Sequence, residues 1–224
     1  MQRKQFLKYL GAALGAAAVP PVLTACGGGD TAVSVPEPLP GSESAPVLLP
    51  ALSAEEIAGL YYMREEEKLA HDVYLALFDR WDAQVFDNIA QSETQHTEAV
   101  RSLILAHGLE DPAATTAPGV FVNADLQALY NQLVDMGQRS LVDALKVGCL
   151  VEETDIRDIE KRKALVIDEP DIVQVYDNLL CGSRNHLRAF NSQLVKQEGV
   201  YEPTVLNQAE WDAIALSPNE SCKG

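Results

Sequence analysis

Hydrophobic residues recur at intervals of three and four along most of the chain after residue 52, which is the spacing of helices that bury one face. Ser53 followed by Glu56 has the pattern of a capping box, Ser140 precedes another periodic segment, and Pro170 suits the first turn of the last one. The pattern predicts four long helices, over about residues 53–79, 82–107, 140–166 and 170–198. The expected fold class is therefore all-α.

The connection between the second and third long helices is more than 30 residues long. Asn123 predicts the start of a short amphipathic helix that ends near Met136. A connection of this length can pass from one end of a helical bundle to the other, so helices two and three can run parallel. Residues 199–224 follow the fourth helix, contain a further short helix near 208–215, and are expected to cover the bundle.

Two polar residues interrupt the hydrophobic stripe of the second helix, which runs from Phe86 to Ile104. Glu93 and His96 lie in the middle of this stripe and are three positions apart, so their side chains point the same way, one turn apart. A single ion could therefore be bound by both. The alternative is a buried hydrogen-bonded pair.

The other long helices also place polar side chains on their inward faces. These are Glu67 in the first helix, Glu152 and Asp155 in the third, and His186 in the fourth. Glu153 is turned by about 100° from Glu152 and is expected to face solvent. The alternatives are a rotated stripe that brings Glu67 and Glu152 to solvent, and a core histidine at His186 bonded to a backbone carbonyl.

Several buried carboxylates in one core require a positive counter-charge, because their combined desolvation cost would exceed the stability of a typical domain. The inward positions identified from the pattern offer no lysine or arginine. Metal ions are then the expected partners, since mixed carboxylate and imidazole ligands on facing helices are typical of di-iron and di-manganese sites.

The formal net charge of the 224-residue chain is −16. A surface this acidic repels nucleic acid and anionic lipid headgroups and attracts cations, so nucleic acid is not an expected partner. The length is that of one domain with tails.

Residues 1–26 have the pattern of an export signal, with Arg3, Lys4 and Lys8 before an apolar segment that closes on Leu-Thr-Ala-Cys. This ending resembles a bacterial lipobox, in which Cys26 is lipidated and becomes the mature N-terminus. The alternative is an ordinary signal cleaved nearby. Residues 27–52 are rich in Gly, Pro and Ser and are expected to link the anchor to a helical domain at 53–198, which the tail at 199–224 covers.

The expected location is the cell envelope of a bacterium, on the periplasmic face and at the outer membrane if the cell is Gram-negative. The export route is left open: residues 3–8 resemble the twin-arginine motif, but Lys4 replaces its second arginine. In an oxidising compartment two of Cys149, Cys181 and Cys222 could form a disulfide, and the sequence does not determine which pair. Cys149 lies within a helical segment and is expected in the core.

Four segments together carry a resemblance to a known family: REEEKLAHDVY (64–74), IAQSETQH (89–96), DALKVGCLVEETDI (143–156) and GSRNHLRAF (182–190). Over about residues 53–215 the chain resembles the ferritin-like superfamily, and most closely its domain-of-unknown-function family 2202. The resemblance implies a four-helix bundle with a long crossover between helices 2 and 3. It also implies a centre of two metal ions, iron in the first place and manganese as the alternative.

The resemblance assigns the metal ligands by position as Glu67, Glu93, His96, Glu152 and His186. Glu67 fits the family's first-helix glutamate because Ala70 and Tyr74 follow at the family's spacing, whereas Glu66 lacks that pattern. The fourth helix departs from the family, which would have a carboxylate at the position of Ser183. Either Asp155 compensates from the neighbouring helix or the site is asymmetric. Additional ligand or supporting candidates are Asp155, Ser183, Tyr74 and Glu66.

Three functions of different class remain open. The first is an oxidase or ferroxidase, a di-iron oxidoreductase that uses dioxygen or peroxide. The second is a non-catalytic envelope protein that binds, stores or senses metal, and a bundle that has lost its metal and serves as an interaction module is a third. Whether the chain is an enzyme is left open, as is homodimerisation, and membrane contact is expected only through the lipid anchor.

Overall fold

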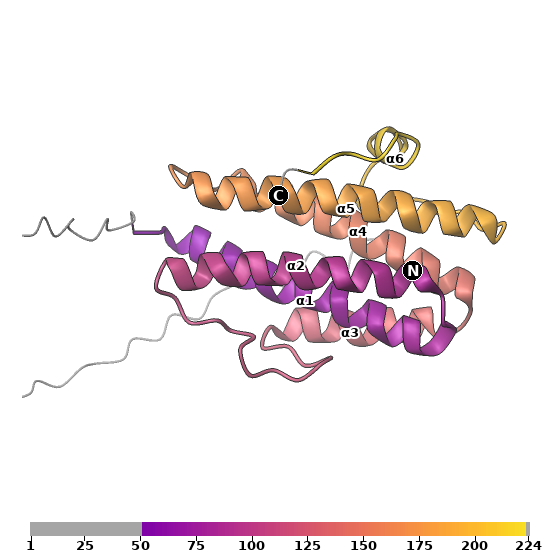
Figure 1. Ribbon diagram of the computed structural model, residues 1–224, viewed down its shortest axis with the longest axis horizontal. Coiled ribbons are helices and arrows are strands. Elements are labelled where there is room, and N and C mark those ends of the chain that lie inside the picture. The colour runs from indigo at the N-terminus through magenta and orange to yellow at the C-terminus, as the bar shows by residue number, and fades with distance from the viewer. Residues whose placement is uncertain (1–50, 223–224) are drawn as a thin grey trace, which may run out of the picture. The chain divides into compact units, whose positions relative to one another are not determined.

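The computed structural model describes residues 51–222, and all regular secondary structure in this range is helical (Figure 1). The four long helices are α1 (Ala54–Trp81), α2 (Gln84–Ala106), α4 (Leu141–Lys163) and α5 (Pro170–Lys196). The two shorter helices are α3 (Ala124–Gly137) and α6 (Gln208–Ala215). The predicted all-α class is confirmed for this part of the chain. The predicted signal at 1–26, Cys26 and the linker up to residue 50 lie outside the described residues.

The helices begin where side chains can satisfy their first backbone N–H groups. Ser53 and Glu56 form the predicted capping box at the start of α1, with a bond of 2.8 Å from the Ser53 N–H to the Glu56 carboxylate. The Asn123 side chain accepts from the N–H groups of Asp125 and Leu126 at the start of α3, and the Ser140 hydroxyl accepts from the Asp143 N–H at the start of α4. Glu169 stands at the N-cap of α5 without a side-chain cap, and Pro170 occupies the first turn, where a missing N–H costs nothing.

The long helices pack as two antiparallel pairs, α1 with α2 and α4 with α5, and each pair contacts the other through α2 with α5 and α1 with α4. Contacts at one end of the domain fix the relative direction of the pairs. The Ile167 N–H, just after α4, donates to Glu56 at the start of α1 at 2.8 Å, and His107 after α2 lies 3.0 Å from Asp171 at the start of α5. Helices α2 and α4 therefore end at the same end of the domain and run parallel.

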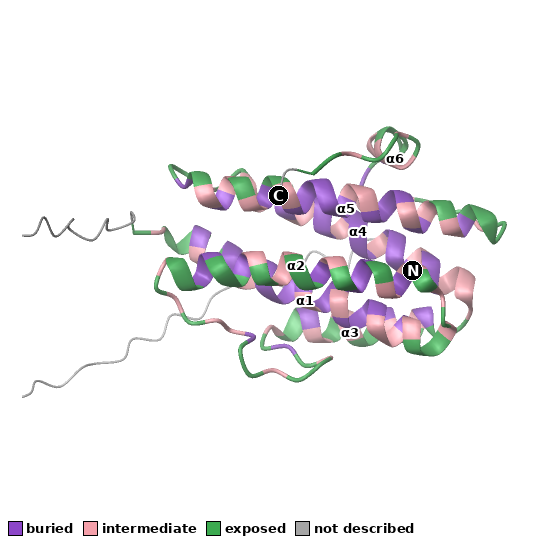
Figure 2. Ribbon diagram, in the orientation of Figure 1, coloured by how far each residue is buried: buried purple, intermediate pink, exposed green. Residues whose placement is uncertain are grey.

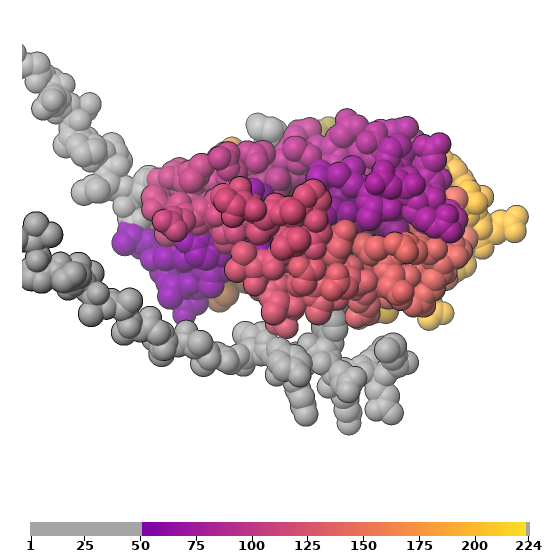
Figure 3. All heavy atoms as spheres, turned by 90° about the horizontal axis from the view of Figure 1, so that it is seen from below, coloured from indigo at the N-terminus to yellow at the C-terminus, as the bar shows by residue number. Residues whose placement is uncertain are grey.

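The segment between α2 and α4, which includes α3, lies over one face of the long helices (Figure 3). Glu65 holds it there, because its buried carboxylate accepts bonds from the N–H groups of Val122 at 2.5 Å and Asn123 at 3.0 Å. The Trp81 indole donates to the Gly137 carbonyl at 2.8 Å and fixes the end of α3. This long connection thus carries the chain to the start of a helix parallel to α2.

The tail after α5 is anchored by Glu153, which corrects the expectation that this residue faces solvent. Its side chain is completely buried. The carboxylate accepts hydrogen bonds from the Tyr201 hydroxyl at 2.5 Å, from the N–H and hydroxyl of Thr204 at 2.9 Å each, and from the Leu206 N–H at 3.1 Å. The tail therefore covers a second face of α4, one that a search for a single hydrophobic stripe misses.

A disulfide joins Cys181 in α5 to Cys222, with Cα atoms 5.6 Å apart, and Cys149 is a free buried core residue as expected. Glu220 strengthens the same attachment through ion pairs with Arg184 at 2.5 Å and Arg188 at 2.7 Å. The end of the tail is therefore fixed to the outer side of α5, next to the segment that carries the candidate site.

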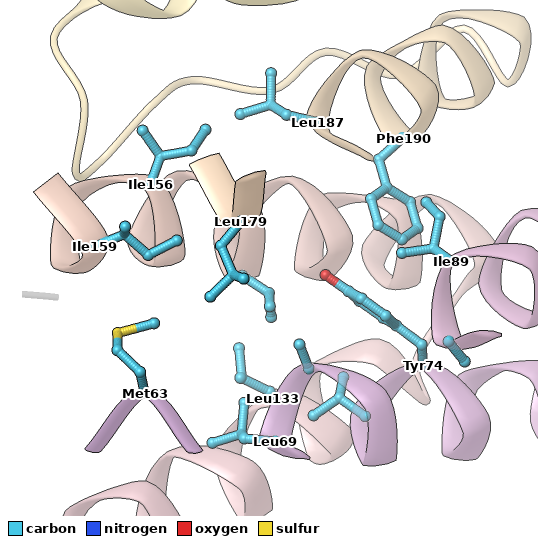
Figure 4. Close-up of a cluster of buried hydrophobic side chains, with 14 of the residues drawn as sticks. Met63, Leu69, Tyr74, Ile89, Leu133, Ile156, Ile159, Leu179, Leu187 and Phe190 are labelled. Atoms are coloured by element: carbon cyan, nitrogen blue, oxygen red, sulfur yellow. The ribbon is translucent and has the colours of Figure 1, made fainter. Parts of the chain in front are cut away.

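Buried residues line the facing sides of the long helices (Figure 2). In this core the Tyr74 ring packs against Phe190, with ring centroids 5.0 Å apart, and its hydroxyl points into the space between the helices (Figure 4). Phe86 completes the aromatic cluster, 5.5 Å from Phe190. Within residues 51–222, no helix combines the length and the hydrophobicity needed to cross a membrane.

Candidate metal centre

The predicted ligand side chains lie together in the interior, between all four long helices. Glu67 comes from α1, Glu93 and His96 from α2, Glu152 from α4 and His186 from α5. All five are buried or nearly so; the His96 side chain is the most accessible, at 12%. The alternative of a rotated stripe with Glu67 and Glu152 in solvent therefore does not hold.

Two histidines and three carboxylates form one continuous cluster. His96 Nδ1 lies 2.9 Å from Glu93 Oε2 and 3.2 Å from Glu67 Oε2. His186 Nδ1 lies 2.8 Å from the other Glu93 oxygen, Oε1, and 3.5 Å from Glu152 Oε2. Glu93 thus divides its carboxylate between the two histidines, and ligand atoms of Glu93, His96 and His186 lie within 4.8 Å of one another.

Several of these polar atoms are buried without a hydrogen bond. His186 Nδ1 is close to two carboxylates but makes a hydrogen bond to neither, and Glu67 Oε1 also has no partner. Buried polar groups in proteins are nearly always satisfied, because an unmet donor or acceptor costs about 1–3 kcal/mol. Buried carboxylate and imidazole atoms that converge without hydrogen-bond partners are the arrangement expected of metal ligands, so the residues present fit a bound cation.

The electrostatics of the histidines follow from their carboxylate neighbours. Burial alone would lower the pKa of His186, but the charges of Glu93 and Glu152 outweigh it and raise the pKa to about 10. Burial likewise opposes the protonation of His96, and Glu93 and Glu67 raise its pKa well above the usual value. Without metal, the carboxylate charges therefore favour the protonated form of both rings.

The pKa values of the three carboxylates shift in opposite directions. Burial would raise the pKa of Glu93, but the two histidinium charges, His186 first, lower it. Burial raises the pKa values of Glu67 and Glu152, and the neighbouring His96 and His186 offset this rise only in part. The pKa of Glu67 reaches about 7. The cluster therefore holds fewer negative charges than its composition suggests until a cation replaces the protons.

Three further residues position the ligands. The Tyr74 hydroxyl donates to Glu152 Oε1 at 2.5 Å, and the Ser92 hydroxyl lies 2.9 Å from His186 Nε2, which directs Nδ1 of that ring inward. Gly182 leaves room for His96, because a Cβ atom at position 182 would stand 2.4 Å from His96 Nε2. Sequence reasoning named Tyr74 and missed Ser92 and Gly182, which have no pattern of their own in the sequence.

The remaining candidates divide into two groups. Asp155 and Ser183 are buried beside the cluster and hydrogen-bonded to each other. Glu66 is buried too, with no hydrogen-bond partner at either carboxylate oxygen, and burial followed by the Asp158 charge raises its pKa well above the usual value. Arg162 corrects the expectation that no arginine faces the buried carboxylates, although its charge acts on Glu66 at the edge of the cluster.

A second group of potential ligands lies at the end of the domain, where His107, Glu169 and Asp171 meet. His107 is paired with Asp171 at 3.0 Å, and Asp171 is 40% exposed. The group also lies at the N-terminus of α5, where the helix dipole disfavours a cation. It is therefore a weaker candidate than the interior cluster. His71 stays outside both groups and contacts Asp72.

The fold and the cluster define a helical domain with a buried carboxylate and histidine site that could hold metal. Residues 56–218 match the family described as "Uncharacterized protein domain (DUF2202)", and the chain belongs to this family. It is 46% identical over 169 residues to "Uncharacterized protein MJ0754" of Methanocaldococcus jannaschii, a match that covers 75% of this chain and 91% of that protein. The crystal structure titled hypothetical protein MJ0754 superposes with a TM-score of 0.75 at 43% identity, covering 79% of this chain and 100% of that one.

Proposed function

We propose that the protein is a ferritin-like four-helix bundle that binds a carboxylate and histidine di-metal centre, with iron as the preferred metal. The observation that carries this proposal is the convergence of Glu67, Glu93, His96, Glu152 and His186, with buried polar atoms that lack hydrogen-bond partners. The antiparallel pairs and the parallel α2 and α4 support the ferritin-like topology.

The protein supplies the ligands and the environment of such a centre. His96 and Glu67 would hold one side, His186 and Glu152 the other, and Glu93 faces both histidines. Tyr74 and Ser92 orient Glu152 and His186, and the buried cluster excludes bulk water. When bound, iron would supply redox chemistry with dioxygen or peroxide, which makes an oxidase or ferroxidase the first candidate activity.

A non-catalytic role in metal storage or sensing is the second candidate. The neutral Ser183 in place of the family's carboxylate favours it, because it reduces the charge available to hold a second ion. The two candidates differ in oxygen use. Addition of Fe(II) consumes oxygen in an oxidase, whereas a storage or sensing protein binds Fe(II) without consumption.

The metal content of the purified full-length chain tests the proposal. We expect about two metal equivalents per chain in the wild type and strong loss in Glu93→Ala/His96→Ala. The matched control is Gln95→Ala/Glu98→Ala, which removes two exposed side chains from the same helix. Equal metal content in the wild type and the Glu93→Ala/His96→Ala variant would contradict the proposal.

Export and lipid anchoring are part of the same proposal and rest on the sequence of residues 1–26. The disulfide between Cys181 and Cys222 is consistent with an oxidising compartment. Cys26→Ser is expected to release the protein from membranes. Continued membrane association of that variant would contradict lipidation.

A further inference from the structure

Asp155 is a buried carboxylate on α4, one turn after Glu152 and only 5% exposed. Its two oxygens have different surroundings. Oδ2 accepts a hydrogen bond from the Ser183 hydroxyl on α5, while Oδ1 is buried with no partner at all. A carboxylate held at one oxygen and open at the other is arranged as a monodentate ligand.

The position of Asp155 places it beside the metal cluster. It lies one turn after Glu152 on α4, and the Ser183 hydroxyl that donates to it lies one turn before His186 on α5, so its carboxylate lies between the two helices that supply these ligands. Glu67 and Glu152 are the glutamates on the two sides of the proposed centre. Glu67 Oε1 is also buried without a partner, so α1 and α4 each present an open carboxylate oxygen in the interior.

Ser183 holds Asp155 rather than replacing it. Ser183 is 1% exposed, and its hydroxyl donates to Asp155 and lies 2.9 Å from the Leu179 carbonyl of its own helix. The hydroxyl proton is shared between these two acceptors, and a neutral hydroxyl is a poorer ligand for a divalent cation than the carboxylate beside it. Its position on α5, one turn before His186, directs Asp155 toward the cluster.

We infer that Asp155 is the additional metal ligand of this centre and that Ser183 is its positioning residue, so that the carboxylate missing from α5 is supplied by α4. The inference rests on the proposed di-metal function and concerns which residues complete it. A carboxylate one turn after Glu152 gives α4 two ligands, as Glu93 and His96 give α2.

The test is a titration of the metal-free full-length chain with Mn²⁺, in which free Mn²⁺ is counted by electron paramagnetic resonance. The wild type is expected to bind about two equivalents. Asp155→Asn keeps the shape and the contact with Ser183 but removes the charge, and it should retain one equivalent while the second weakens by about 10–100-fold. The matched control is Asp158→Asn, which should bind Mn²⁺ as the wild type does. Asp158 lies one turn further along the same helix and accepts a hydrogen bond from Tyr62.

Substitutions at Ser183, alone and combined with Asp155→Ala, separate a ligand role from a structural one. Ser183→Ala should weaken the second equivalent, and Ser183→Thr, which keeps the hydroxyl, should restore it. The exchange variant Asp155→Ala/Ser183→Glu returns a carboxylate from α5 and should recover the second equivalent that Asp155→Ala loses. Circular dichroism checks that each variant is folded.

Two equivalents of unchanged affinity in Asp155→Asn would overturn the inference and leave the proposed function intact. Equal weakening in Asp155→Asn and Asp158→Asn would also overturn it, since the effect would then not be specific to the ligand. A wild type that binds no Mn²⁺ or Fe(II) would instead remove the proposed function itself.

Discussion

His96 of α2 and His186 of α5 stack on each other, with ring centroids 5.3 Å apart and ring planes 28° apart. Two imidazolium rings repel at this distance, and the Glu93 carboxylate between their Nδ1 atoms offsets the repulsion. A dication could take over the role of both protons. The stacked pair therefore links metal binding to proton release.

Metal binding is predicted to release protons at neutral pH. His186 has a pKa of about 10 without metal and is protonated at pH 7, and His96 is shifted in the same direction, so both must lose a proton before Nδ1 can bind a cation. Calorimetry in buffers of different ionisation enthalpy should show release near pH 7 that declines above about pH 10. Binding at pH 7 without proton release would contradict the account.

The stability of the metal-free protein should depend on pH with a definite sign. A histidine whose folded pKa is raised stabilises the fold fully below its unfolded pKa of about 6.5, and that contribution is lost as the pH rises toward 10. Urea unfolding of the metal-free chain should show this decline, and His186→Phe should reduce it. A decline of equal size in His186→Phe would show that another group is responsible.

Gly182→Ala is predicted to impair metal binding. The new Cβ would lie 2.4 Å from His96 Nε2, so the ring must rotate and withdraw Nδ1 from Glu67 and Glu93. A loss of about 10–100-fold in metal affinity is expected. Gly59→Ala is the matched control, because its Cβ would meet Tyr176 at an ordinary 3.4 Å. Similar affinities in the two variants would show that the space at Gly182 does not control His96.

Glu153→Ala is predicted to release the tail while leaving the metal site in place. The substitution leaves the Tyr201, Thr204 and Leu206 donors without their acceptor, and hydrogen bonds to a charged group contribute about 1.5–3 kcal/mol each. Unfolding free energy should fall by about 3 kcal/mol or more, with faster proteolysis after residue 198. The exposed Glu160→Ala on the same helix should change stability by less than about 0.5 kcal/mol. A stable Glu153→Ala variant that loses metal instead would contradict this assignment.

Loss of the disulfide is predicted to destabilise the fold without removing the site. Cys181 and Cys222 are 41 residues apart, and the chain-entropy estimate for a loop of this length is about 4 kcal/mol. Cys181→Ala/Cys222→Ala should unfold at lower urea concentration and become insensitive to reductant. Cys149→Ala should keep the sensitivity to reductant. If reductant leaves the wild-type unfolding curve unchanged, the pairing is wrong.

The helices could be predicted from sequence because each satisfies local rules. Ser53, Asn123 and Ser140 cap helices where their side chains accept backbone N–H groups, and the helix ends fall within a few residues of the expected positions. The inward-facing polar residues could also be predicted from sequence, because a buried glutamate or histidine interrupts a hydrophobic stripe. Glu93 and His96 are the clearest case.

The remaining features depend on contacts between distant segments. The prediction that Glu153 faces solvent was wrong because α4 buries a second face under the tail. The periodicity of α4 does not indicate that Glu153 contacts Tyr201, which lies 48 residues further along the chain. The pairing of Cys181 with Cys222 and the approach of Gly182 to His96 arise only once α5 is packed. Ser183 could be recognised as a departure from the family, but its bond to Asp155 could not.

Anomalous X-ray diffraction from crystals of the protein loaded with Fe(II), recorded on both sides of the iron absorption edge, tests the central claim most directly. The account predicts iron peaks in the interior cluster, at bonding distance from ligand atoms of Glu67, Glu93, His96, Glu152 and His186. Peaks at His107, Glu169 and Asp171 instead, or no iron in the interior cluster, would contradict it.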